Sequence, residues 1–214
     1  MLCNATRPAE WGRVREITAA HPGIIPCYGV HPWFSAEAAG DWLEKLEAFL
    51  LLAPSCAGEI GLDAARATPG QEEIFRAQLK LALKLGRPAV IHCVRAWGRL
   101  LEIRRETAPP RFMLHAYSGA PELVKELAAL GGYFSFGVGL MVPERAKLRA
   151  SLAAVPRGRL LLETEAPAPG AACGAGPAGI VEIVKAAAAV LGVNAGELAE
   201  LSCRNGSEFT GLPL

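Results

Sequence analysis

The sequence predicts an α/β fold in which helices cover parallel strands, either a (β/α) barrel or a doubly wound open sheet. Short apolar runs alternate with longer segments in which apolar residues recur at helical spacing. The runs are apolar throughout, which is typical of strands buried on both faces, and such strands are usually parallel. No linker or change of composition divides the 214 residues, so we expect one domain over residues 1–214.

The predicted strands recur roughly once every 30 residues, the spacing of repeated βα units. Each is a short apolar run with a segment of helical pattern after it. In chain order they are Met1–Ala5, Ile24–Val30, Ser55–Ile60, Ala89–Cys93, Phe112–Ala116, Tyr133–Val138 and Arg159–Thr164.

Two of the intervening segments carry the clearest helix signals. Over residues 68–86, Thr68 and Gln71 fit a capping box with a proline at the first helical position, and Gly86 fits the residue that follows the last turn. Residues 121–132 follow the same plan, with a proline near the start and two glycines at the end. The apolar stripe of the first segment consists of Phe75, Leu79 and Leu83.

Composition excludes several classes of protein. With 51% hydrophobic and 20% charged residues, the chain is too apolar to be disordered, and its apolar stretches fall short of the ~20 residues that span a bilayer. A formal charge of +1 gives no globally basic surface for nucleic acid. The six cysteines are scattered without a Cys-x-x-Cys pair, and the first residues lack a signal-peptide pattern, so we expect a reduced, cytoplasmic protein without membrane contact.

Polar side chains stand where several predicted strands end. In a (β/α) barrel the carboxyl ends of the strands carry the catalytic groups, and imidazole with carboxylate suits zinc or manganese. A single histidine at a strand end is more often a hydrogen-bonded packing residue, and the acids could cap helices or lie on the surface. Three of the four histidines nevertheless fall at this end, which favours a metal site. The candidates are His31, Glu59, His92, His115, Glu163 and Glu165.

Five motifs in this order resemble the TatD-like metal-dependent hydrolases, which are amidohydrolase-type barrels and include metal-dependent deoxyribonucleases. The resemblance covers nearly the whole chain, and the Gly-Glu-Ile-Gly-Leu-Asp run is close to diagnostic. The motifs are Gly29-Val30-His31-Pro32-Trp33, Gly58-Glu59-Ile60-Gly61-Leu62-Asp63, Pro88-Ala89-Val90-Ile91-His92, Leu114-His115-Ala116-Tyr117-Ser118-Gly119 and Leu161-Leu162-Glu163-Thr164-Glu165-Ala166-Pro167.

The resemblance implies a role for each candidate. Glu59 would bridge two metal ions, and His92 and His115 would hold one of them. Glu165 would occupy the position where the family has an aspartate that binds metal and transfers a proton. His31 would contact the substrate phosphate. The implied cofactors are one or two divalent ions (Zn²⁺, Mn²⁺ or Mg²⁺). The implied reaction is cleavage of phosphodiester bonds in DNA, with Glu59 and Glu165 as catalytic groups.

The chain departs from the family in three places. It has no His-x-His pair, which the family carries on its first strand. Glu165 replaces an aspartate, which moves the carboxylate by about 1.5 Å. Where the family often has an arginine two residues after the histidine of the fourth run, this chain has Val94, and Arg95 follows.

Length fits a barrel that lacks one unit. Eight βα units take about 250 residues, or roughly 31 each, so the 214 residues suggest seven of eight, with the first unit missing at the N-terminus. Three hypotheses remain: a deoxyribonuclease whose start lies upstream, an impaired member that acts as a metal-binding or non-enzymatic protein, and a hydrolase of another ester or amide. The oligomeric state stays open.

Overall fold

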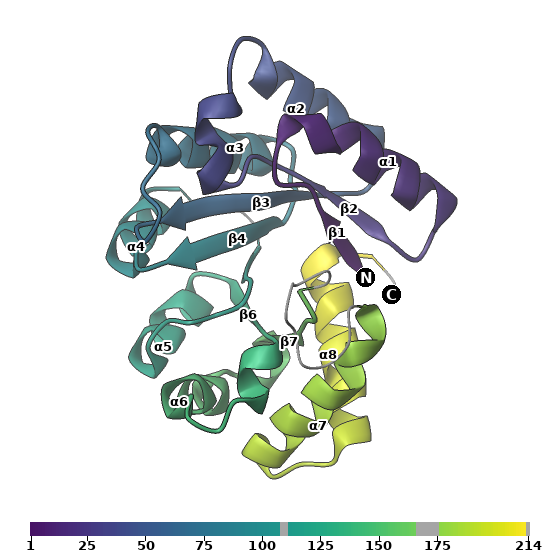
Figure 1. Ribbon diagram of the computed structural model, residues 1–214, viewed down its shortest axis with the longest axis vertical. Coiled ribbons are helices and arrows are strands. Elements are labelled where there is room, and N and C mark those ends of the chain that lie inside the picture. Colours follow the sequence, from purple (N-terminus) through teal and green to yellow (C-terminus); the bar gives the residue numbers. More distant parts are fainter. Residues whose placement is uncertain (108–110, 166–175, 213–214) are drawn as a thin grey trace. The chain divides into compact units, whose positions relative to one another are not determined.

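The computed structural model describes residues 1–107, 111–165 and 176–212 (Figure 1). The chain forms two compact units, the first made of residues 1–113 and 209–214 and the second of residues 114–208. Each unit carries its own strands and helices, and each is described by itself below.

The first unit contains four parallel strands that pair in chain order, β1 with β2, β2 with β3 and β3 with β4. Helices α1 and α2 pack on β2, α3 packs on β3 and α4 packs on β4 (Figure 1). The elements are β1 (Leu2–Asn4), η1 (Pro8–Glu10), α1 (Trp11–Ala20), β2 (Ile25–Tyr28), η2 (Pro32–Glu37), α2 (Trp42–Leu52), β3 (Cys56–Asp63), α3 (Gln71–Lys84), β4 (Ala89–Val94) and α4 (Trp97–Glu106).

Helix α3 shows how the sequence signals operate and where two of them were wrong. Phe75 and Leu79 of the predicted stripe are buried, whereas Leu83 is exposed. Gly86 has φ +64°, and the N–H groups of Gly86 and Arg87 donate to the Leu83 and Ala82 carbonyls, which closes the last turn as predicted. The predicted capping box is wrong, because the helix begins only at Gln71, after a left-handed residue at position 70.

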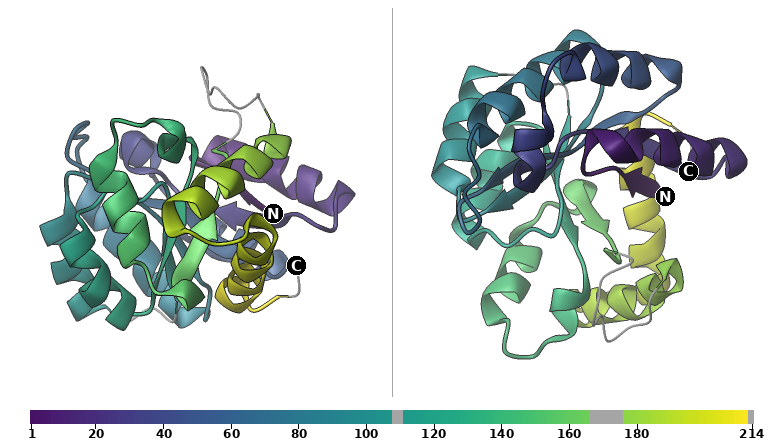
Figure 2. Two further views of the ribbon diagram at one scale, coloured as in Figure 1. Left: turned by 90° about the horizontal axis from the view of Figure 1, so that it is seen from below. Right: turned by 45° about the horizontal axis from the view of Figure 1, so that its top comes forward.

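The second unit contains the parallel pair β6 and β7, with β5 at the boundary between the units. Helices α5, α6 and α7 contact one another in that order, and α7 also packs on η3 and β7 (Figures 1 and 2). The elements are β5 (Phe112–Leu114), α5 (Pro121–Ala129), β6 (Gly132–Phe136), η3 (Val138–Met141), α6 (Ala146–Ala154), η4 (Arg157–Arg159), β7 (Leu160–Leu162), η5 (Pro177–Gly179), α7 (Ile180–Leu191) and α8 (Ala195–Thr210).

Each predicted strand matches one of the seven strands found among the described residues. β3 runs three residues beyond its predicted end and β4 one, whereas β1 ends one residue and β2, β5, β6 and β7 each end two residues earlier than predicted. Within the described ranges, Cys3, Cys27, Cys56, Cys93 and Cys203 are free thiols, and Cys173 lies outside them.

No single helix among the described residues has the length and apolar character needed to cross a membrane. The segments Pro177–Leu191 and Ala195–Thr210 meet the length and composition criteria only as a pair, and the chain bends by 107° between them.

Candidate functional site

Three predicted site residues meet in the first unit around one carboxylate oxygen. Glu59 Oε1 lies 3.0 Å from His92 Nδ1 and 3.3 Å from His31 Nε2. The two imidazole rings are 4.3 Å apart between centroids. His31 is buried, and only 12% of the Glu59 side chain is exposed. We call these three residues the His–Glu–His group.

A break in the register of β3 places the Glu59 side chain. Ala57 pairs with Ala89 and Ile60 with Ile91, so three steps on β3 match two on β4. An extra residue of this kind locally bends a strand and re-aims a side chain. The Glu59 N–H, released from regular pairing, donates to the Ala5 carbonyl just after β1 at 3.0 Å.

A glycine keeps β4 close to β3 beside this group. Gly61 has φ +152°, a conformation that other residues rarely adopt. A Cβ atom at this position would overlap the carbonyl oxygen of His92. The backbone that carries His92 can therefore approach β3 only because residue 61 has no side chain.

Asp63, which was not among the predicted site residues, lies behind His92. Its Oδ2 atom accepts the Trp33 indole N–H at 2.6 Å and lies 3.3 Å from His92 Nε2. Its Oδ1 atom accepts the N–H groups of Ala65 and Arg66 at 2.9 and 3.0 Å. Burial raises the pKa of Asp63, but these hydrogen bonds outweigh burial, so the pKa lies below its ordinary value. The ionised Asp63 thus faces His92 Nε2 and leaves Nδ1 toward Glu59, the pattern typical of a metal-binding histidine.

His31 has a different hydrogen-bonding state from His92. It precedes η2, and its Nδ1 atom accepts the backbone N–H of Trp33 at 3.2 Å. In a neutral ring the proton must then be on Nε2, which faces Glu59. This nitrogen is a hydrogen-bond donor, and a protonated nitrogen cannot ligate a metal.

The second unit brings together His115, Glu163 and Glu165, which we call the His–Glu–Glu group. His115 Nδ1 lies 3.7 Å from Glu163 Oε2 and 4.0 Å from Glu165 Oε1. Glu163 also accepts the backbone N–H of Ala116. Ala116 and Glu165 both have positive φ angles, +44° and +52°. The three side chains offer a mixed imidazole and carboxylate donor set.

Every predicted site residue thus lies in one of the two groups. Glu59, His31 and His92 are in the first, and His115 and Glu165 are in the second. Glu163, for which the sequence also allowed an ordinary surface role, is a member of the second group. Asp63 could have been found from its spacing, because residues 59, 61 and 63 alternate along one strand and alternate residues share a face.

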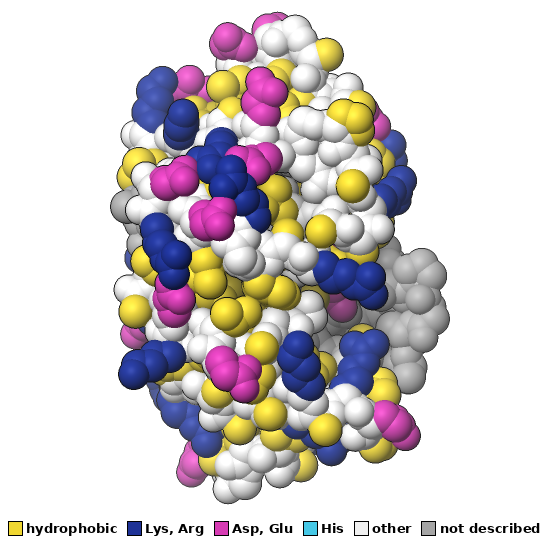
Figure 3. Space-filling view, turned by 90° about the vertical axis from the view of Figure 1, so that its left-hand side faces the viewer, with side chains coloured by type: hydrophobic (Ala, Val, Ile, Leu, Met, Phe, Trp, Pro, Cys, Tyr) yellow, Lys and Arg dark blue, Asp and Glu magenta, His cyan; other side chains and the backbone are white. Residues whose placement is uncertain are grey.

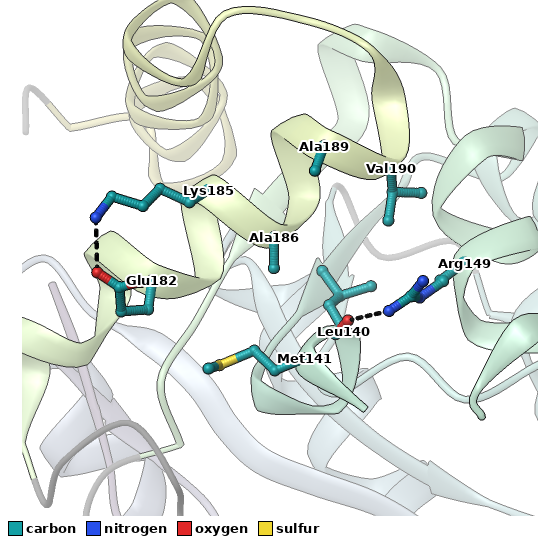
Figure 4. A pocket seen from close by; sticks show the side chains of 8 residues that line it. All are labelled: Leu140, Met141, Arg149, Glu182, Lys185, Ala186, Ala189 and Val190. Atoms are coloured by element: carbon teal, nitrogen blue, oxygen red, sulfur yellow. Dashed lines mark hydrogen bonds and ion pairs between the residues drawn. The ribbon is translucent and has the colours of Figure 1, made fainter. Parts of the chain in front are cut away.

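A surface groove in the second unit has no link to these residues. It has a volume of about 490 Å³ and lies between η3, α6 and α7 (Figure 4). Lys185 pairs with Glu182 on one side, and Arg149 donates to the Leu140 carbonyl at 3.2 Å on the other. None of its lining residues is a predicted site residue.

Comparisons with known proteins agree on one family. The family model described as TatD related DNase matches residues 1–210. The 3'-5' ssDNA/RNA exonuclease TatD of Edwardsiella piscicida is 35% identical over 182 residues, which cover 78% of this chain and 67% of that protein. The uncharacterized metal-dependent hydrolase YjjV of Escherichia coli K12 is 29% identical over 174 residues, with the same shares covered.

The fold is similar to that of a solved relative. The crystal structure of YjjV, a TatD homolog from Escherichia coli K12, matches with a TM-score of 0.89 at 24% identity and covers 99% of this chain and 86% of that chain. This similarity confirms the predicted (β/α)-barrel fold class. The matched segment spans about two thirds of the length of the curated relatives. The chain belongs to the TatD family of metal-dependent hydrolases.

Proposed function

We propose that this protein hydrolyses phosphodiester bonds in single-stranded nucleic acid, DNA above all, with the help of bound divalent cations. The observation that carries the proposal is the carboxylate of Glu59 held between two imidazoles, with the ionised Asp63 behind one of them. The relative named as an ssDNA/RNA exonuclease supports the choice of substrate.

The chemistry of the donor atoms fits a cation in each group. In the first, Glu59 and His92 Nδ1 would hold it, and His31 would not, because its Nε2 carries the proton. In the second, His115, Glu163 and Glu165 would hold it. Imidazole nitrogen with carboxylate oxygen favours Zn²⁺ or Mn²⁺ over Mg²⁺, which prefers oxygen ligands alone. We therefore propose one or two ions per chain.

The side chains then divide the work of hydrolysis. A bound divalent cation lowers the pKa of water and offsets charge on a phosphoryl oxygen. His31, as a donor, would contact a non-bridging phosphate oxygen of the substrate. Asp63 would keep the His92 proton on Nε2 and so hold Nδ1 ready as a ligand. Glu165 would accept the proton that the attacking water releases.

Metal analysis combined with a nuclease assay tests this function. We expect the purified protein to carry zinc or manganese below full occupancy, and Glu59→Ala to remove the metal bound by the first group. Glu47→Ala is the matched control, because Glu47 pairs with Lys84 on the surface of the same unit. Equal metal in wild type and Glu59→Ala would remove Glu59 from the ligand set. Loss of nuclease activity in EDTA and recovery with Mn²⁺ or Zn²⁺ would support the reaction.

A second candidate is a catalytically impaired relative that binds metal without turnover. Two features favour it: the sequence has no His-x-His pair, and Glu165 replaces the family aspartate. A protein that carries metal but cleaves neither nucleic acid nor simple ester or amide substrates would establish it. Activity on esters or amides alone would instead support the third hypothesis.

Two broader proposals accompany the function. We place the protein in the cytoplasm, because its described cysteines are free thiols. That residues 1–214 form one barrel domain stays a prediction.

A further inference from the structure

An exposed aromatic ring borders the His–Glu–His group. Trp33 is 39% exposed, although its ring centroid is only 4.9 Å from that of His31 and 6.2 Å from that of His92. A partly exposed aromatic ring offers a face on which a nucleic-acid base can stack. Whatever contacts this ring lies next to the imidazole of His31.

Trp33 is held in place from several sides. Its indole N–H donates to Asp63 at 2.6 Å, and its backbone N–H donates to His31 at 3.2 Å. The carbonyl of Pro32, directly before it, accepts the hydroxyl of Thr68. A ring fixed in this way loses little conformational freedom when a ligand stacks on it.

A guanidinium group without an acidic partner lies over this ring. The central carbon of the Arg66 guanidinium is 4.7 Å from the Trp33 ring centroid. Arg66 is exposed, and within the described ranges no carboxylate lies at ion-pair distance from its guanidinium. Two other exposed arginines of this unit, Arg13 and Arg99, do pair with glutamates.

We propose that Trp33 and Arg66 form a nucleotide subsite for single-stranded nucleic acid at the edge of the His–Glu–His group. The indole would stack on a base, and the guanidinium would contact a backbone phosphate. Aromatic stacking accepts every base, and arginine adds charge and a further stacking plane. The proposal rests on the proposed function, since it names how the substrate of that same site is held.

Local recognition of this kind suits the charge of the molecule. The formal net charge is +1, and acidic and basic side chains lie interspersed on the face drawn in Figure 3. A surface without a strong field of one sign gives little general attraction to phosphates. Individual contacts such as the Arg66 guanidinium therefore have to supply a larger share of the affinity.

Steady-state kinetics of the metal-loaded protein test the subsite. The substrates are an oligothymidylate of about 12 nucleotides and a strand of equal length without its 3′-terminal bases. We expect Trp33→Ala to raise KM for the first about 10-fold and to leave KM for the second nearly unchanged. We expect Arg66→Ala to raise KM for both substrates. It should also make the slope of log(kcat/KM) against log[salt] shallower by about 0.7, the value for one lost phosphate contact.

Three further variants separate binding from folding. Arg66→Lys should keep the salt dependence, and Arg13→Ala should match wild type on both substrates. Trp33→Phe loses the N–H that bonds to Asp63 but keeps an aromatic ring. Because the ring can still stack on a base, KM should stay within about 3-fold of wild type. If Trp33→Phe loses as much as Trp33→Ala, Trp33 only supports Asp63 and the subsite is wrong.

The remaining outcomes are equally decisive. Wild-type KM in both Trp33→Ala and Arg66→Ala overturns the subsite and leaves the proposed function standing. A wild-type protein that does not cleave nucleic acid overturns both.

Discussion

The His–Glu–His and His–Glu–Glu groups differ in how closely the protein itself holds them. In the first, Glu59 lies within 3.3 Å of both imidazoles, and Asp63 contacts His92 from the other side. In the second, His115 is 3.7 and 4.0 Å from its two carboxylates, beyond ordinary hydrogen-bond distance. Glu165 is also the more exposed acid, with 35% of its side chain accessible.

This difference suggests that the two groups respond differently to a cation. In the first group the Glu59 carboxylate accepts the N–H of His31 Nε2, and Asp63 accepts that of His92 Nε2, so this group should keep its shape without metal. Two carboxylates around one imidazole repel each other, and a cation between them would relieve that repulsion. We therefore expect the first group to be preformed and the second to tighten when it binds metal.

The largest effect we expect comes from the glycines beside the two groups. Gly61→Ala should lower the free energy of unfolding by about 3 kcal/mol, because its positive φ and the His92 carbonyl leave no room for Cβ. Gly137→Ala, beside the second group, should cost about 1 kcal/mol or less, since a Cβ would lie 3.1 Å from the Glu163 carbonyl oxygen. Urea denaturation followed by circular dichroism measures both. Equal losses would contradict the view that the first group is the more tightly built.

An intermediate effect should follow from removing the charge behind His92. Asp63→Asn loses the carboxylate that fixes the His92 proton on Nε2, so metal affinity should fall about 10- to 100-fold. Titration with Zn²⁺ or Mn²⁺ against a competing chelator measures it. Asp41→Asn is the control, because Asp41 is exposed and pairs with Lys45. An unchanged affinity in Asp63→Asn would show that His92 needs no partner to bind metal.

The smallest effect concerns the length of one side chain in the second group. Glu165→Asp shortens the carboxylate by about 1.5 Å and restores the residue that the family carries there. We expect kcat on single-stranded DNA to rise about 10-fold, because proton transfer depends steeply on position. Glu182→Asp, at an exposed pair with Lys185, should change nothing. A fall in kcat would mean that the site is adapted to glutamate.

The positions of the strands and the candidate metal-binding side chains could be predicted from the sequence, because both depend on local patterns. Apolar runs mark buried parallel strands, and His92 and Glu59 stand out as polar residues in such runs. The contact between Asp63 and Trp33 could not be predicted, since it joins the side chains of residues 30 positions apart in sequence. The sequence also predicts the wrong start for α3, because the Thr68 hydroxyl bonds to the Pro32 carbonyl and to the Gln71 side chain and caps no backbone N–H of the helix.

The register break in β3 has a consequence for how this protein can vary. The extra residue between Ala57 and Ile60 determines which side of the strand each later residue faces, because side chains alternate. A deletion there would restore even pairing with β4, but the residues before the break would then face the opposite side relative to the residues after it. Substitutions at neighbouring positions do not change which face of the strand each side chain occupies. Insertions and deletions in β3 should therefore be far rarer among functional variants than changes of residue type.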